Sequence, residues 1–297
     1  MSLNRSAAFK IGQLISHIVL MLFSLAAILP FLLMAMASIT DEKTLFREGY
    51  SFFPSKLSFY AYEYLFVSNA TTIFRAYGVT MMITIVGTSL CLLFAPMFGY
   101  ALSRKDNKKR GVLTFFVFFT MLFNGGLVPQ YLMYTQMLNI KNSFWALIVP
   151  NLLMNGFIIL LMKSYFVLNI HPALIEAAKI DGAREFYIYR RIVMPLSLPI
   201  LATIGLMNGI AYWNDWMNGL YYITDPRLYS LQNLLNRILM SINFLKEYGT
   251  AAGLHMDIPT ASVRLAMTLI GTLPILVLYP FFQKFFVKGI SLGGIKG

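Results

Sequence analysis

Six long apolar runs constrain this 297-residue chain more than any other feature. Each is near the roughly twenty residues that an α-helix needs to cross about 30 Å of hydrocarbon. The whole chain is 58% hydrophobic and only 12% charged, which excludes a soluble globular domain of this length. We therefore expect an all-α membrane protein. The predicted spans are residues 15–38, 77–102, 112–134, 144–166, 196–220 and 265–286.

Several of these runs contain helix-breaking residues. They include Pro30, Pro96, Gly125, Gly126, Pro129, Pro150, Pro274 and Pro280. Membrane helices tolerate such residues where neighbouring groups satisfy the freed carbonyls. We therefore expect kinked helices around an internal cavity, in one transmembrane domain over residues 15–286.

The distribution of lysine and arginine predicts the orientation. The apolar run 11–39 is too long for a secretory signal, so we expect an uncleaved first span after a cytoplasmic segment, residues 1–14. This arrangement puts 15 of the 24 basic residues inside, including the cluster at 104–110. Short loops rich in Lys and Arg stay in the cytoplasm. Both termini, the Gly-rich tail 287–297 and the loop 168–195 are therefore expected there.

Two sizeable loops are expected outside, at residues 40–76 and 221–263. The first is rich in Tyr and Phe, which predicts either an interfacial helix on the bilayer or a contact for a partner. The second has a turn signal at Asp225-Pro226 and then a helical apolar pattern from Leu228 to Leu239.

The sequence lacks the usual signs of an enzyme or a metalloprotein. Cys91 is the one cysteine, and His17, His171 and His255 belong to no metal-binding motif. The net charge of +12 follows membrane topology, so we expect no nucleic acid partner. No Gly-rich phosphate-binding loop is present, so we expect no ATPase site in this chain and no catalytic or metal residues.

A polar segment follows the fourth apolar run, at residues 168–195. Pro172 suits the first turn of a helix, and Gly182 suits its end because glycine adopts the left-handed conformation without a steric cost. A second helix is predicted from Ala183 to Val193, ended by Pro195. Such a helix–turn–helix elbow would lie flat at the membrane surface.

This polar segment resembles the EAA loop of bacterial ABC importer permeases. The matching residues are Glu176, Ala177, Ala178, Asp181, Gly182, Ala183 and Pro195, with Met194 where the family usually has Leu. The resemblance implies a type I ABC importer fold with six spans, in a bacterial cytoplasmic (inner) membrane. In that family the loop is the coupling helix that docks into a cleft of the ATPase subunit.

The resemblance also implies partners. These would be a second homologous permease subunit, two ATP-binding-cassette ATPase subunits that carry ATP and Mg, and an extracytoplasmic solute-binding protein. Trp213-Asn214 and the tail pattern from Lys288 to Gly297 are similar to carbohydrate importers of the maltose class, including the branch that handles oligosaccharides and alginate-like glycans. The implied function is ATP-driven carbohydrate import, most simply of an oligosaccharide.

The fifth run carries an unusual density of polar and aromatic residues. Asn208, Tyr212, Asp215 and Gly219 would share one face of a continuous helix. Polar groups in hydrocarbon are costly unless they face an interior or a wet cavity, and amides, carboxylates and aromatic rings suit a sugar. Helix–helix hydrogen bonding is the alternative role. The candidate pathway residues are Asn151, Asn155, Asn208, Tyr212, Trp213, Asn214, Asp215 and Trp216.

Two other functions fit the sequence less well than import. A stand-alone proton-coupled secondary transporter would use Asp215 as its proton site, but no internal repeat is detectable and an exposed elbow would have no purpose in it. An intramembrane enzyme would need catalytic pairs that the sequence does not contain.

Overall fold

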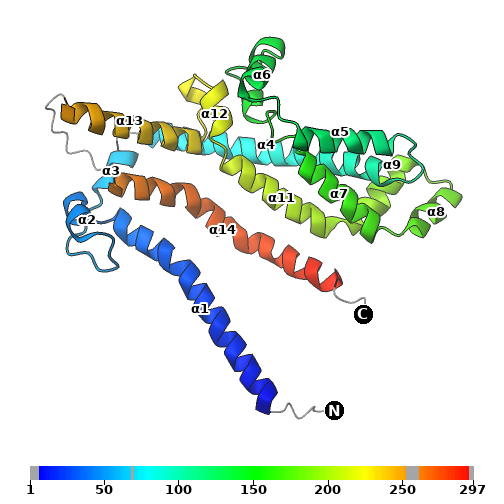
Figure 1. Ribbon diagram of the computed structural model, residues 1–297, viewed down its shortest axis with the longest axis horizontal. Coiled ribbons are helices and arrows are strands. Elements are labelled where there is room, and N and C mark those ends of the chain that lie inside the picture. Colours follow the sequence, from blue (N-terminus) through cyan, green and yellow to red (C-terminus); the bar gives the residue numbers. More distant parts are fainter. Residues whose placement is uncertain (1–6, 68–69, 252–260, 294–297) are drawn as a thin grey trace. The chain divides into compact units, whose positions relative to one another are not determined.

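The computed structural model describes residues 7–67, 70–251 and 261–293, which are built from helices (Figure 1). Within these ranges there is no sheet, and the only pairing is an isolated bridge between Thr40 and Leu57. The prediction of an all-α protein is confirmed. Residues 1–6 of the predicted N-terminal segment, 252–260 of the second external loop and 294–297 of the tail lie outside the described residues.

Two compact units make up the chain. One unit contains residues 1–70 and 238–273, and the other contains residues 71–237 and 274–297. Helix α13 (Leu231–Ala251) and helix α14 (Ala261–Gly293) contribute to both.

The first unit contains α1 (Ala7–Ser38), α2 (Glu42–Glu48) and α3 (Tyr60–Phe66). Glu42 ties the start of α14 to α2. Its carboxylate accepts hydrogen bonds from the backbone N–H groups of Ala261 and Ser262 at 2.8 and 2.9 Å and from the Ser262 hydroxyl at 2.6 Å. A carboxylate at a helix N-terminus satisfies N–H groups that have no partner within the helix.

The second unit is a helical bundle. Its helices are α4 (Ala70–Ser103), α5 (Arg110–Leu122), α6 (Leu127–Leu132), α7 (Gly156–Asn169), α8 (Pro172–Ile180), α9 (Glu185–Ile188), α10 (Met194–Leu196), α11 (Leu198–Trp213) and α12 (Met217–Tyr222). Two π-helices, η1 (Met133–Met137) and η3 (Tyr189–Val193), and two 3₁₀-helices, η2 (Phe144–Leu147) and η4 (Pro226–Leu228), connect them.

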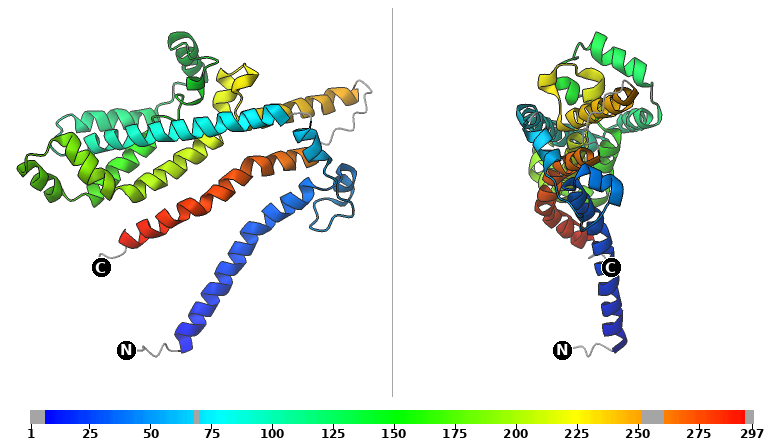
Figure 2. Two further views of the ribbon diagram at one scale, coloured as in Figure 1. Left: turned by 180° about the vertical axis from the view of Figure 1, so that it is seen from behind. Right: turned by 90° about the vertical axis from the view of Figure 1, so that its left-hand side faces the viewer.

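Helix α4 is the element against which the bundle packs (Figures 1 and 2). Gly99 permits the close approach of α7, because a Cβ at this position would lie 2.6 Å from the Met162 Cβ. Cys91 and Ala95 of α4 join one buried apolar cluster with Met162 and with Ile204 of α11. The same cluster reaches α8 and α9, so the elbow is packed onto the C-terminal end of α4.

The predicted spans agree with the structure where the apolar run is uninterrupted. Helices α1, α4 and α14 contain the first, second and sixth predicted spans. Helix α14 continues to Gly293, so the predicted tail 287–297 begins as helix.

The other three predicted spans, 112–134, 144–166 and 196–220, are each interrupted in the structure. Gly126 (φ 88°) lies in the break between α5 and the helical stretch Leu127–Met137, which meet at 114°. In the fourth run, Pro150 and Asn151 (φ 62°) precede α7, which begins only at Gly156. In the fifth run, α11 ends at Trp213.

Two helices, α1 and α4, are long and apolar enough to cross a membrane, and the described residues give up to five spans if each of three bent helix pairs is one span. Helix α14 adds an apolar stretch over Ala261–Val277. The count of six spans therefore stays a prediction.

Candidate functional site

Helix α8, the first helix of the elbow, is defined by local chemistry at both ends. His171 Nδ1 accepts the backbone N–H of Ala173 at 3.3 Å, and Pro172 occupies the first turn. At the other end Gly182 has φ +78°, and the N–H groups of Gly182 and Ala183 donate to the carbonyls of Lys179 and Ala178. This pair of bonds is a Schellman motif, which confirms the predicted role of Gly182.

The two faces of α8 differ in their surroundings. Ile175 and Ala178 are buried in the apolar cluster against α4 and α7. On the opposite face, Ala173, Ala177 and Ile180 are exposed, Ile180 by 86%. Glu176 and Asp181 are also exposed, and the Asp181 N–H donates to Ala177. The two alanines of the EAA pattern therefore differ, since Ala178 anchors the helix and Ala177 lies on its open face.

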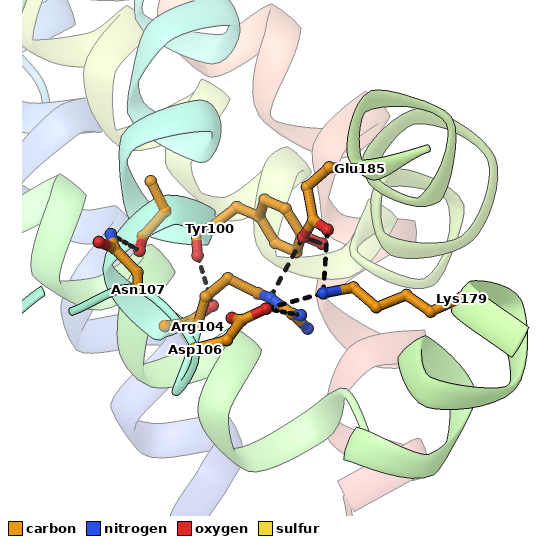
Figure 3. Close-up of polar contacts among 8 residues, drawn as sticks. Tyr100, Arg104, Asp106, Asn107, Lys179 and Glu185 are labelled. Atoms are coloured by element: carbon orange, nitrogen blue, oxygen red, sulfur yellow. Dashed lines mark hydrogen bonds and ion pairs between the residues drawn. The ribbon is translucent and has the colours of Figure 1, made fainter. Parts of the chain in front are cut away.

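A five-residue polar cluster fixes the elbow to α4 (Figure 3). Lys179 Nζ lies 2.7 Å from Asp106 Oδ2 and 3.4 Å from Glu185 Oε2. Arg104 lies between the same two acids, with Nη2 2.8 Å from Asp106 and Nε 3.2 Å from Glu185. The Tyr100 hydroxyl donates to Glu185 Oε1 at 2.7 Å. We call these residues the elbow cluster.

The elbow cluster favours the charged form of Asp106. Hydrogen bonds from Lys179 and then Arg104 lower the pKa of Asp106 to about 2. Two cations and two carboxylates alternate, so each charge has two partners of opposite sign. Such networks hold their geometry better than an isolated surface pair, which contributes about 0–1 kcal/mol.

The second helix of the elbow is more irregular than predicted. Instead of one helix over 183–193, α9 passes into the π-helix η3 and then α10. Pro195 does not end it, because α10 runs to Leu196 and the bend to α11 comes at Ser197. A π-turn before a proline avoids the clash between the proline ring and the preceding carbonyl. Ala183 is half-buried against the apolar cluster.

Three pathway candidates lie on α11, and all are buried. Tyr212 donates its hydroxyl to the Ile148 carbonyl at 2.9 Å. Trp213 lies with its ring centroid 6.3 Å from that of Tyr77. Asn208 is 2% exposed, and its Nδ2 has no hydrogen-bond partner among the described residues.

The remaining pathway candidates lie where helices begin or end. Asp215 accepts the N–H groups of Met217 and Asn218 at the start of α12, and Asn155 accepts those of Phe157 and Ile158 at the start of α7. Asn151 has φ 62°. Asn214 follows the last residue of α11, and Trp216 is exposed. Because α11 ends first, the predicted shared face of Asn208, Tyr212, Asp215 and Gly219 was wrong.

A cavity of about 350 Å³ lies between α4 and α11, and the sequence did not predict its polar residues. Thr84 and Thr88 of α4 face Gly205 and Gly209 of α11 there, and Trp213 also lines it. The Oγ1 atoms of both threonines are buried without a hydrogen-bond partner in the described part of the chain. Threonines four residues apart in an apolar helix are the signal that could have found them.

No group of three or more His, Cys, Asp or Glu side chains that could hold a metal ion occurs within the described ranges.

Known proteins resemble this chain along nearly its whole length. The polygalacturonan/rhamnogalacturonan transport system permease protein YtcP of Bacillus subtilis is 35% identical over 278 residues, covering 94% of this chain and 96% of its own. Protein LplC of the same organism is 36% identical over 270 residues, covering 91% and 90%. The arabinooligosaccharides transport system permease protein AraQ of Halalkalibacterium halodurans is 30% identical, covering 91% and 92%.

A solved structure and a family model agree with these relatives. The structure is a chain of a bacterial ABC transporter involved in the import of the acidic polysaccharide alginate, with a TM-score of 0.75 and 28% identity, covering 96% of this chain and 100% of that chain. The family model of the binding-protein-dependent transport system inner membrane component matches residues 74–292, which include α4, the elbow and α11. The chain belongs to this family of inner membrane permease components.

Proposed function

We propose that this chain is the carbohydrate-translocating membrane subunit of a type I ABC importer. It would span the membrane six times with both termini in the cytoplasm and pair with a second homologous permease subunit. Two ATPase subunits would bind the elbows, and an extracytoplasmic solute-binding protein would deliver the sugar. Family membership and the sugar-transport relatives support this proposal.

The observation that carries the proposal is the open face of α8. Ala173, Ala177 and Ile180 form an exposed apolar surface, with two small residues, on a helix whose other face is buried against the bundle. An exposed apolar face on an ordered helix fits a groove in a partner, where small side chains allow close approach. That face is bordered by Glu176, Asp181 and Gly182. The two acidic residues would form the polar edge of the docking surface, and Gly182 forms the turn at its end.

The elbow cluster would link movement of α8 to movement of α4. A partner that moved α8 would also move Lys179, whose ion pairs lead through Asp106 and Glu185 to Arg104 and Tyr100 at the end of α4. ATP binding and hydrolysis on the partner ATPase subunits would thereby shift the bundle between inward-facing and outward-facing states. The link works because α8 and α4 are joined both by ion pairs and by apolar packing.

The substrate class follows from the relatives and from the cavity. YtcP and AraQ are named for oligomeric or polymeric sugars. The hydroxyl groups of Thr84 and Thr88 can contact sugar hydroxyls, and the ring of Trp213 can contact the C–H face of a pyranose. No charged side chain lines the described part of this cavity. We therefore infer an oligosaccharide substrate that this subunit contacts through uncharged groups.

The test is reconstitution of the chain with its second permease, ATPase and binding protein in liposomes. Oligosaccharides of polygalacturonate, rhamnogalacturonan, alginate and arabinan are each compared for stimulation of ATP hydrolysis and for uptake. Stimulation by at least one supports the proposal. Uptake driven by a proton gradient in the isolated chain would instead support the stand-alone transporter, in which Asp215 would have to release the bonds it makes to α12.

A further inference from the structure

A second cavity, of about 320 Å³, lies beneath the elbow. Four cationic side chains and two carboxylates line it, and Glu185 outside the lining pairs with two of the cations, so one positive charge is in excess. The charged residues are Arg104, Lys105, Arg110, Lys179, Asp106 and Glu176. A cavity with this excess charge suits an anion.

The charges in this cavity are not equivalent. Arg104 and Lys179 are already neutralised, because each pairs with Asp106 and Glu185 in the elbow cluster. Lys105 and Arg110 have no ion pair within the described residues, and both are exposed. These two side chains are therefore the groups free to receive an anionic ligand.

Part of the cavity lining is apolar. This part consists of Phe166, Val167 and Ile170 at the end of α7 and Ile175 of α8. Val167 is 54% exposed, so an apolar ligand could reach this part of the lining from outside the bundle. A small inorganic anion would contact only the cationic side chains, whereas an amphipathic ligand would contact the cationic and the apolar side chains.

The location of the cavity favours a lipid. It lies where α4 ends at Ser103 and α5 begins at Arg110, two apolar helices joined by the basic connector 104–109. That is the level at which spanning helices leave the hydrocarbon and meet phospholipid headgroups. Basic pockets between spanning helices at this level bind anionic headgroups, and Arg forms bidentate bonds with phosphate.

We propose that this cavity binds the headgroup of an anionic phospholipid of the cytoplasmic leaflet. Lys105 and Arg110 contact the phosphate, and the upper acyl chain lies against Val167 and Ile170. The proposal rests on the proposed function for its placement at the cytoplasmic surface. Since Lys179 and Glu176 line the same cavity, a bound lipid would also support α8 from the membrane side.

The experiment measures retention of phosphatidylglycerol by the assembled complex in phosphatidylcholine nanodiscs. Lys105→Ala/Arg110→Ala removes the two unpaired cations and leaves the elbow cluster intact. Lys108→Ala/Lys109→Ala is the matched control, because it removes two cations of the same connector that do not line the cavity. Each cation in contact with the lipid phosphate contributes roughly a factor of five, so the first variant should lose about thirty-fold in affinity. The control should lose much less, because its two cations do not line the cavity.

Three results would overturn the proposal. These are equal retention by both variants, displacement of the lipid by inorganic phosphate that binds as tightly as the lipid does, or a cross-link from position 105 to an ATPase subunit in place of lipid. Retention can be measured on the chain without its ATPases. Failure of the proposed import function would therefore appear separately, as absence of the ATPase subunits from the purified complex.

Discussion

Lys179 of α8 donates a hydrogen bond to Asp106, a residue of the connector after α4, at 2.7 Å. This contact joins the proposed docking helix to the longest helix of the bundle across 73 positions of sequence. Lys179 also pairs with Glu185, so one side chain connects both helices of the elbow to this connector.

Reversing the charge at Lys179 should uncouple ATP hydrolysis from uptake. Lys179→Glu places three carboxylates together, whereas Lys179→Glu combined with Asp106→Lys restores a pair of opposite charges. We expect uptake per ATP to fall several-fold in the single variant and to recover substantially in the double variant. Exposed pairs contribute only about 0.2–1 kcal/mol each, so the amount of inserted protein should change little. Equal coupling in both variants would show that the pair does not transmit motion.

Gly182 should tolerate asparagine better than valine. Its φ of +78° strains a β-branched residue, and a Cβ would meet nothing within 4 Å, so the cost is conformational and not steric. We expect Gly182→Val to destabilise the elbow by about 1–2 kcal/mol and to abolish most coupled uptake. Gly182→Asn should retain much more, since Asn adopts the left-handed region more readily. Wild-type uptake by the valine variant would count against the role of this turn.

Local chemistry explains which parts of the elbow could be predicted from sequence. Pro172 and Gly182 act through their own backbones, so α8 and its ending were predictable. Tyr100 and Glu185 are 85 positions apart, and their contact depends on how α4 packs against α9, which no local pattern encodes. The π-helix before Pro195 was likewise missed, because proline was treated as a helix end.

The broken spans have a similar explanation. The length of an apolar run indicates whether it could cross the hydrocarbon. It does not indicate whether a side chain within the run caps the start of a new helix. Asp215 and Asn155 each accept two backbone N–H groups at a new helix start, a capping role that was not predicted from the sequence. Asn followed by Gly at 155–156 was a helix-start signal that could have divided the fourth run.

Acid should loosen the elbow only at low pH. The lowered pKa of Asp106, about 2, means that its ion pairs contribute fully above its ordinary value near 4 and are lost as the pH falls from about 4 through 2. Spin labels at positions 108 and 173 should therefore give one distance distribution from pH 5 to 8 that broadens below pH 4. Asp106→Asn should remove most of that change. Broadening between pH 6 and 7 would assign the transition to another group.

Thr84 and Thr88 should affect transport more than stability. Valine has nearly the shape of threonine, and neither hydroxyl has a protein partner among the described residues, so Thr84→Val/Thr88→Val should leave the thermal midpoint nearly unchanged or raise it. If the cavity contacts sugar, the KM for uptake should rise several-fold. Tyr212→Phe is the comparison, since it removes the bond to Ile148 and should cost about 1 kcal/mol of stability without the same change in KM. An unchanged KM in the double threonine variant would remove this cavity from the pathway.

The most direct test of the coupling claim is cysteine cross-linking in the assembled complex. Cysteines at Ala177 and Ile180 are exposed on α8, whereas a cysteine at Ala178 is buried against the bundle. The native Cys91 is buried and can be replaced by alanine. We predict cross-links from positions 177 and 180 to the ATPase subunit that change in yield when ATP is added, with none from position 178. Failure of both exposed positions to cross-link, while the complex still hydrolyses ATP and imports sugar, would contradict the account.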